Sequence, residues 1–218
     1  MTDTLTAIES DDFWARVRAA LAAIQPARKE RVPAYGHSAI AQLMASKPQT
    51  GTRIDHEIEQ AWADSADEQV PMSLVIVEID RMSDYFTAYG KDANDACVRA
   101  VMQTIANALP RDEHMCLRMG GHRFVIALPD MPLKAAKSNA AKIAKAVRKL
   151  GRAHKESHAG IVTASVGFAV VDPEGDYDKG LFTAAMGALK KAQRKGLGRM
   201  HGVDLRPAQE RRRRKLAA

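Results

Sequence analysis

The chain of 218 residues contains little of several things that would define a protein class. Cys97 and Cys116 are its two cysteines, too few for a disulfide framework, and we expect both to be buried free thiols in a reducing compartment. No uninterrupted apolar run reaches the roughly 18 residues that a membrane-spanning helix needs. The acidic, polar N-terminus is wrong for a secretion signal. These absences predict a cytoplasmic protein.

Aromatic residues are also scarce, at 5% of the chain, although hydrophobic residues reach 46%. The core must therefore be built mainly from Ala, Val, Ile, Leu and Met. Residues 211–215 contain no aromatic residue, so we do not expect that segment to read a nucleic-acid sequence by base stacking. The length fits one domain with extensions or two small domains.

Charge is unevenly placed along the chain. From Lys190 onward, eleven basic and two acidic residues give +9, so the first 189 residues sum to −2 of the total +7. This end includes five consecutive cations: Arg211, Arg212, Arg213, Arg214 and Lys215. We expect any affinity for nucleic acid, anionic membrane or an acidic partner to reside in this tail. The alternative is a disordered, solubilising tail.

The first 50 residues predict a helical extension and a linker. Residues 10–24 have amphipathic spacing, with Ser10 as an N-cap and Phe13, Val17 and Leu21 on one face. Residues 26–36 are polar and contain Pro and Gly, and residues 38–46 form a shorter helical pattern. These helices either pack on their own domain or pair two chains into a homodimer.

From residue 52 the pattern alternates between helix and strand. Helical spacing is expected around residues 54–62, 93–109, 133–150 and 182–195, with Ile143, Val147 and Leu150 facing inward in the third. Strands are expected at residues 74–77, 161–171 and 201–205, the last at a sheet edge. This order predicts an α+β fold, an antiparallel sheet with helices on one side.

The middle of this region contains a glycine hairpin. Two apolar runs, 115–119 and 124–128, flank Gly120-Gly121. A glycine pair between two strands predicts a tight turn, because glycine reaches positive φ without steric cost. His122 and Arg123 are then presented at the tip.

The segment Arg118-Met119-Gly120-Gly121-His122-Arg123-Phe124 resembles the signature hairpin of GGDEF domains, the diguanylate cyclase family, with both acidic residues replaced. Further motifs occur in the family's order over about residues 51–200: Gln49-Thr50-Gly51-Thr52-Arg53, Pro71-Met72-Ser73-Leu74 through Glu78-Ile79-Asp80, Tyr89-Gly90, Thr163-Ala164-Ser165-Val166-Gly167-Phe168-Ala169, Ala188-Leu189 and Gly196. The resemblance implies a palm-like, nucleotidyl-cyclase (ferredoxin-like) fold. It implies an extension at 1–50, a degenerate GGDEF domain at 51–205 and a basic tail at 206–218.

Active members of that family condense two GTP molecules into cyclic di-GMP, using divalent metal held by carboxylates. The resemblance places Glu78 and His122 at the metal-ligand positions and Arg123 at the position of a further acid. Imidazole is a poor ligand for Mg²⁺, and Arg123 reverses a charge beside the metal. The resemblance therefore implies an inactive, vestigial site made of Glu78, Asp80, Gly120, Gly121, His122 and Arg123, with no metal or other cofactor.

The other binding positions are also altered. The family's guanine-contacting Asn aligns with Phe86, while its partner Asp is kept as Asp95. The Lys and Arg that hold the triphosphate align with Gln193 and Leu197. In the family's inhibitory Arg-x-x-Asp motif, Arg111 is kept and His114 replaces the Asp. Asp95 and Arg111 are thus the retained nucleotide-binding candidates.

The resemblance therefore predicts a catalytically inactive GGDEF-like domain that acts as a protein-interaction or regulatory module in bacterial cyclic di-GMP signalling. One alternative is a cyclic di-GMP or GTP sensor that binds without turnover. Another is a divergent diguanylate cyclase that uses Glu78 and Asp80. The sequence names no protein partner.

Overall fold

The computed structural model describes residues 51–207, apart from 112, 113 and 115. The chain divides into two units, 1–33 and 34–218, and all described residues lie in the second. The predicted N-terminal helices at 10–24 and 38–46, and the cations at 211–215, lie outside the described residues. None of the described helices is long and apolar enough to cross a membrane.

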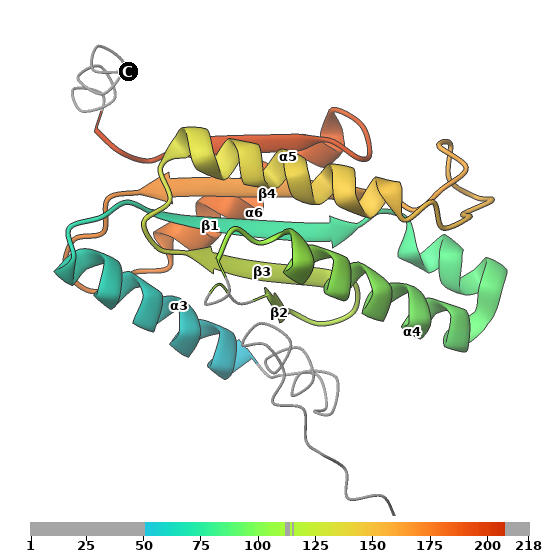
Figure 1. Cartoon of the computed structure of the whole chain (residues 1–218), viewed down its shortest axis with the longest axis horizontal. Coiled ribbons are helices and arrows are strands. Elements are labelled where there is room, and N and C mark those ends of the chain that lie inside the picture. The colour runs from blue at the N-terminus through green and yellow to red at the C-terminus, as the bar shows by residue number, and fades with distance from the viewer. Residues whose placement is uncertain (1–50, 112–113, 115, 208–218) are drawn as a thin grey trace, which may run out of the picture. The chain divides into compact units, whose positions relative to one another are not determined.

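The described part alternates helices with the strands of one sheet (Figure 1). Its elements are α3 (Gly51–Asp67), β1 (Met72–Ile79), α4 (Met82–Ala108), β2 (Cys116–Arg118), β3 (Arg123–Leu128), α5 (Leu133–Lys149), β4 (Ala164–Val171), α6 (Gly180–Arg194) and β5 (Met200–Asp204). The predicted hairpin, the four helical regions and the edge strand are all present. The α+β, palm-like class is confirmed.

The five strands lie in the order β2-β3-β1-β4-β5. β1 pairs antiparallel with both β3 and β4, but β5 runs parallel to β4. The expected wholly antiparallel sheet is therefore wrong, and the sheet is mixed. The reason is that α6 carries the chain back along the sheet after β4, and such a crossover returns the next strand in the same direction.

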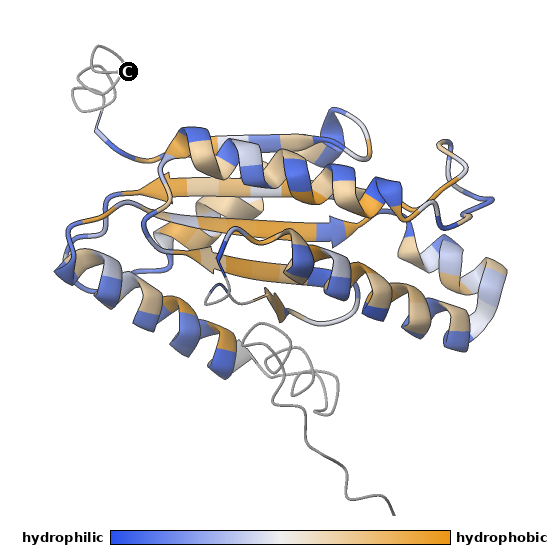
Figure 2. Ribbon diagram, viewed as in Figure 1, coloured by the Kyte–Doolittle hydropathy of each residue, from blue (hydrophilic) through white to orange (hydrophobic). Residues whose placement is uncertain are grey.

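Helices cover both faces of the sheet, which corrects the expectation of one covered face. On β1, Val75, Val77 and Ile79 point into a core shared with α4 and α5. Leu74 and Ile76 alternate with them and point into a second core shared with α3 and α6. The nearly continuous apolar run of β1 follows from burial on both faces, and Figure 2 shows the central strands as the most hydrophobic elements.

All four helices differ from their predicted bounds, and the differences in α4 and α5 have consequences. α4 begins at Met82, eleven residues before the predicted start at 93, because two helical segments meet at Gly90 with φ 79° and ψ 179°. α5 ends at Lys149, and Gly151 follows at φ 58°. Leu150 therefore lies past the helix and is exposed, so its predicted inward position is wrong. Ile143 and Val147 are buried as predicted.

Both cysteines are buried free thiols, as predicted. Burial raises the pKa of the Cys97 thiol and raises the pKa of Cys116 to about 12. Both are therefore protonated at neutral pH, and neither is a reactive thiolate.

Arg206, the first residue assigned to the basic tail, is buried and forms a bidentate ion pair with Asp204 at 2.8 and 3.0 Å. The packed domain thus extends at least to this residue.

Candidate functional site

The hairpin tip is held by its own backbone and by one arginine. Gly120 and Gly121 adopt φ values of 90° and 51°, a conformation that a side chain would strain. Arg118 Nε and Nη2 both donate to the Gly121 carbonyl oxygen, at 2.8 and 2.6 Å. These two hydrogen bonds could not be predicted from the sequence, because the position of Arg118 does not indicate which carbonyl oxygen its guanidinium contacts. The tip is therefore fixed, and it presents His122 and Arg123 beside the end of β1.

Strand register brings Arg123 opposite Glu78. The two residues are direct partners across the antiparallel β1–β3 ladder. Arg123 Nε donates to Glu78 Oε2 at 2.6 Å, and Gln193 on α6 donates from Nε2 to Oε1 at 3.0 Å. His122 Nε2 lies 3.8 Å from Oε1, beyond hydrogen-bond distance, so Arg123 is the stronger partner. Arg123 thus forms an ion pair with the carboxylate that the family resemblance assigns to metal.

These neighbours change the acidity of Glu78. The His122 ring, the Arg123 guanidinium and the Gln193 amide together hold its pKa at about 2, against the desolvation that raises it. Glu78 is thus a carboxylate at every physiological pH, and a side-chain cation neutralises it.

We expect Arg123→Gln to destabilise the protein at pH 5–7 by about 1–2 kcal/mol. The folded-state pKa of Glu78 lies below the unfolded value, so the ion pair stabilises above about pH 4.5, and this contribution is lost as the pH falls towards 2. Urea unfolding at pH 6 and pH 2.5 should show the full difference between variant and wild type at pH 6 and a smaller difference at pH 2.5, where part of the Glu78 side chains is protonated. Arg53→Gln is the matched control, because Arg53 pairs with Glu57 only at the surface, at 3.7 Å. If Arg53→Gln lowers the free energy of unfolding at pH 6 as much as Arg123→Gln does, the ion pair between Arg123 and Glu78 does not stabilise the fold more than a surface ion pair.

Asp80 lies two residues beyond Glu78 but belongs to a different network. It is buried and accepts hydrogen bonds from Thr163 Oγ1 at 2.7 Å, Ser165 Oγ at 2.7 Å and the Gly198 backbone N–H at 2.8 Å. All three donors come from β4 and its approach or from the turn after α6. Sequence reasoning placed Asp80 in the vestigial site but missed these partners. The Thr-x-Ser spacing puts both hydroxyls on one face of the strand, but no pattern indicates what they bind.

The donor set does not fit a divalent metal. Mg²⁺ prefers oxygen ligands, and here one carboxylate is paired with an arginine while the other accepts hydrogen bonds from three protein donors. Among the residues that the structure describes, no group of three His, Cys, Asp or Glu side chains lies together as a metal site would require. Both carboxylates at the end of β1 are thus committed to protein partners.

A hollow of about 390 Å³ lies beside the hairpin, between the first half of α4 and the tip. Its lining includes Phe86, Asn94, Arg118 and His122. Phe86 is 49% exposed, so its ring faces solvent at this hollow. Asp95 is partly buried on α4 and does not line the hollow, whereas its neighbour Asn94 does.

Arg111, the residue of the family's inhibitory motif that this chain keeps, forms an ion pair within the domain. Arg111 Nη2 donates to Asp130 Oδ2 at 2.8 Å, and both side chains are exposed. His114, at the position of the motif's Asp, is buried. Arg111 and Asp95 are not among the side chains that contact Glu78, which are His122, Arg123 and Gln193.

Comparisons with known proteins agree with this architecture. A family model described as "Diguanylate cyclase, GGDEF domain" matches residues 51–199. The chain belongs to the GGDEF family. A search of curated proteins found none that matches the chain.

Solved structures share the fold of this GGDEF domain. The active GGEEF domain of a diguanylate cyclase from Vibrio cholerae is 21% identical, with a TM-score of 0.58 over 67% of this chain and 92% of that one. The GGDEF domain of DgcB from Caulobacter crescentus, in complex with c-di-GMP, is 22% identical, with a TM-score of 0.61 over 68% and 85%. The coiled coil and GGDEF domain of DgcB is 20% identical, with a TM-score of 0.62 over 87% and 98%.

Proposed function

We propose that this GGDEF domain does not condense GTP and acts as a binding or regulatory module in cyclic di-GMP signalling. The observation that carries the proposal is the contact between Arg123 Nε and Glu78 Oε2 at 2.6 Å. A protein cation occupies the carboxylate that the resemblance assigns to metal. GTP condensation needs that metal to activate a hydroxyl and neutralise phosphate charge.

The surrounding residues support the same conclusion. Gln193, at a phosphate-holding position of the family, is turned to Glu78 instead. Phe86, at the guanine-reading position, offers a ring for stacking but no donor or acceptor for a base edge. Asp80, the second carboxylate of the divergent-cyclase alternative, accepts three hydrogen bonds inside the core.

We expect no cyclic di-GMP from the purified protein. Incubation with GTP and Mg²⁺ or Mn²⁺, followed by chromatography, should give no product above a blank, while the active domain from Vibrio cholerae run in parallel should give product. Cyclic di-GMP that forms with this protein and disappears in Glu78→Ala would overturn the proposal, because Glu78 would then be a catalytic carboxylate.

Nucleotide binding without turnover is the second candidate, favoured by the exposed Phe86 ring at the hollow beside the hairpin. Calorimetric titration with GTP and with cyclic di-GMP, each with and without Mg²⁺, separates the two candidates. Binding that is independent of Mg²⁺ and lost in Phe86→Ala would support a sensor. If neither nucleotide gives a heat of binding, the domain would act through a partner other than these two nucleotides.

A further inference from the structure

The fold separates charges that are mixed along the sequence. α5 carries six outward cations and no acidic residue: Lys134, Lys137, Lys142, Lys145, Arg148 and Lys149. The end of α6 and the turn after it carry five more exposed cations, again without an acid: Lys190, Lys191, Arg194, Lys195 and Arg199. We call these eleven residues the basic face. The slightly negative sum of the first 189 residues hides the six cations of α5, because α3 supplies Asp55, Glu57, Glu59, Asp64 and Asp67 elsewhere.

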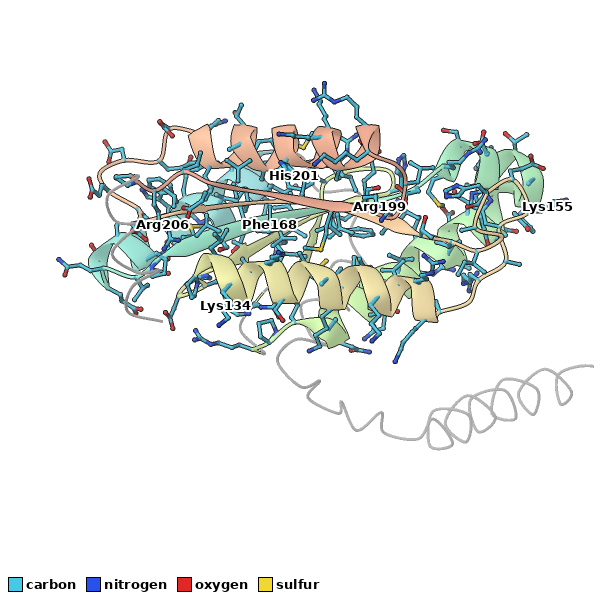
Figure 3. The ribbon with its side chains drawn as sticks, turned by 90° about the horizontal axis from the view of Figure 1, so that it is seen from above. Lys134, Lys155, Phe168, Arg199, His201 and Arg206 are labelled. Atoms are coloured by element: carbon cyan, nitrogen blue, oxygen red, sulfur yellow. The ribbon has the colours of Figure 1, made fainter. Side chains whose placement is uncertain are left out.

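The two groups of cations lie on either side of one strand edge. α5 covers one face of the sheet and α6 the other, and β5 runs between them as the edge strand (Figure 3). Lys134 labels the α5 group in that view, and Arg199, the last cation of the second group, lies at the start of the edge strand. The basic face therefore consists of two rows of cations separated by the edge of the sheet.

These cations are not neutralised within the domain. Within the described part of the chain, none of the eleven forms an ion pair with another described residue. His201 on β5 lies within the positive potential of these cations. Burial lowers the pKa of its imidazole, and the charges of Lys191 and Lys195 lower it further. Positive potential thus reaches the strand edge between the rows.

Positive charge is the property of the basic face that a ligand can recognise. The apolar side of α5, with Ala136, Ala140, Ile143 and Val147, is buried in the core and cannot enter a lipid bilayer. The exposed positions between its cations are Ser138 and Ala141. No aromatic residue occurs in α5 or in residues 190–199 to stack on an unpaired base. Phosphates of a duplex need neither insertion nor stacking, and the two strands of a duplex present two rows of them.

We propose that the basic face binds the phosphate backbone of duplex nucleic acid without reading its sequence. Lys and Arg on the two rows contact phosphates of the two strands, and the release of condensed counterions drives binding. The proposal does not depend on whether the domain condenses GTP, because the basic face contains none of the residues that contact Glu78.

The test uses the full-length protein and a fluorescein-labelled 20-base-pair DNA duplex of arbitrary sequence, with anisotropy measured at several salt concentrations. Two triple variants remove charge from the face: Lys137→Gln, Lys142→Gln and Lys145→Gln in one, and Lys190→Gln, Lys191→Gln and Arg194→Gln in the other. Arg53→Gln, Lys91→Gln and Arg99→Gln form the control, which removes the same net charge from exposed positions on α3 and α4. Gln keeps helix propensity close to that of Lys and Arg, and thermal melting checks each fold.

Each face variant should weaken duplex binding about tenfold or more near 100 mM salt, and should make the slope of log K against log salt shallower by about 2–3. The control should change this slope by less than about 0.9, which is the contribution of a single phosphate contact. Equal effects of face and control variants would overturn the proposal, since binding would then follow net charge alone. Unchanged binding by both face variants would also overturn it and assign the affinity to the tail. Phosphatidylglycerol vesicles bound as tightly as the duplex, and weakened by the same variants, would make the face a membrane surface instead.

Discussion

Asp80→Ala is expected to lower the free energy of unfolding by about 2–4 kcal/mol. The Asp80 carboxylate joins two segments that are distant in sequence, the start of β4 and the turn after α6, to the end of β1. Alanine leaves the Thr163 and Ser165 hydroxyls and the Gly198 N–H without their acceptor in a buried region. An unsatisfied buried donor costs about 1–3 kcal/mol, and hydroxyl rotation recovers part of that cost.

Urea unfolding measures this effect as a lower midpoint at unchanged slope. Asp80→Asn is the conservative control, because the amide oxygen still accepts and its NH₂ can donate to a hydroxyl that turns, so the loss should be about 1 kcal/mol. Glu78→Ala is the positional control and should cost less than Asp80→Ala, since Arg123 is 37% exposed and can return to water. A loss in Asp80→Ala no larger than in Glu78→Ala would show that the three hydrogen bonds do not stabilise this part of the fold.

The contrast between these two carboxylates bears on the proposal that the domain does not condense GTP. Both come from the Glu-Ile-Asp end of β1, where the family resemblance places metal. One is now neutralised by a cation from the neighbouring strand, and the other by dipoles from the core. Burial of a carboxylate is costly unless partners compensate, and each of these carboxylates has protein partners that compensate for it. Under this proposal, an acid placed at His122 alone would not produce GTP condensation, because Glu78 and Asp80 would keep their protein partners.

Local patterns were sufficient for most elements of the fold. The Gly120-Gly121 pair predicted the hairpin, and the spacing of Ile54, Ile58 and Trp62 predicted the buried face of α3, because both signals act over a few residues. The direction of β5 could not be obtained in this way. A short strand has the same alternation in either direction, and only the crossover through α6 makes it parallel.

The candidate site was predictable in its residues but not in its contacts. The resemblance placed Glu78 and Arg123 in one site, but their opposition depends on the β1–β3 register, and the Gly120-Gly121 hairpin constrains only β2 against β3. Gln193 and Gly198 reach Glu78 and Asp80 from α6 and from the turn after it, so their contacts depend on how that helix lies on the sheet. The charge balance of the chain likewise hid the basic face, because net charge adds residues that the fold places far apart.

Gly167→Ala is expected to destabilise the protein by about 3 kcal/mol or more, near the upper end for overpacking. A Cβ at Gly167 would lie 2.2 Å from the Leu189 backbone nitrogen and 2.5 Å from the Ala185 carbonyl oxygen. These are main-chain atoms of α6, so relief requires the whole helix to move away from β4. Such a shift would also withdraw Gln193 from Glu78, which links this core position to the site.

Gly187→Ala is the matched control on the same helix. Gly187 is exposed and nothing lies within 4 Å of its added Cβ, so alanine should stabilise α6 by about 1 kcal/mol through its higher helix propensity. The two substitutions add the same methyl group and should move the urea midpoint in opposite directions, without changing its slope. Unfolding of Gly167→Ala at the wild-type midpoint would mean that α6 does not cross β4 at this residue, and the placement of Gln193 beside Glu78 would fail with it.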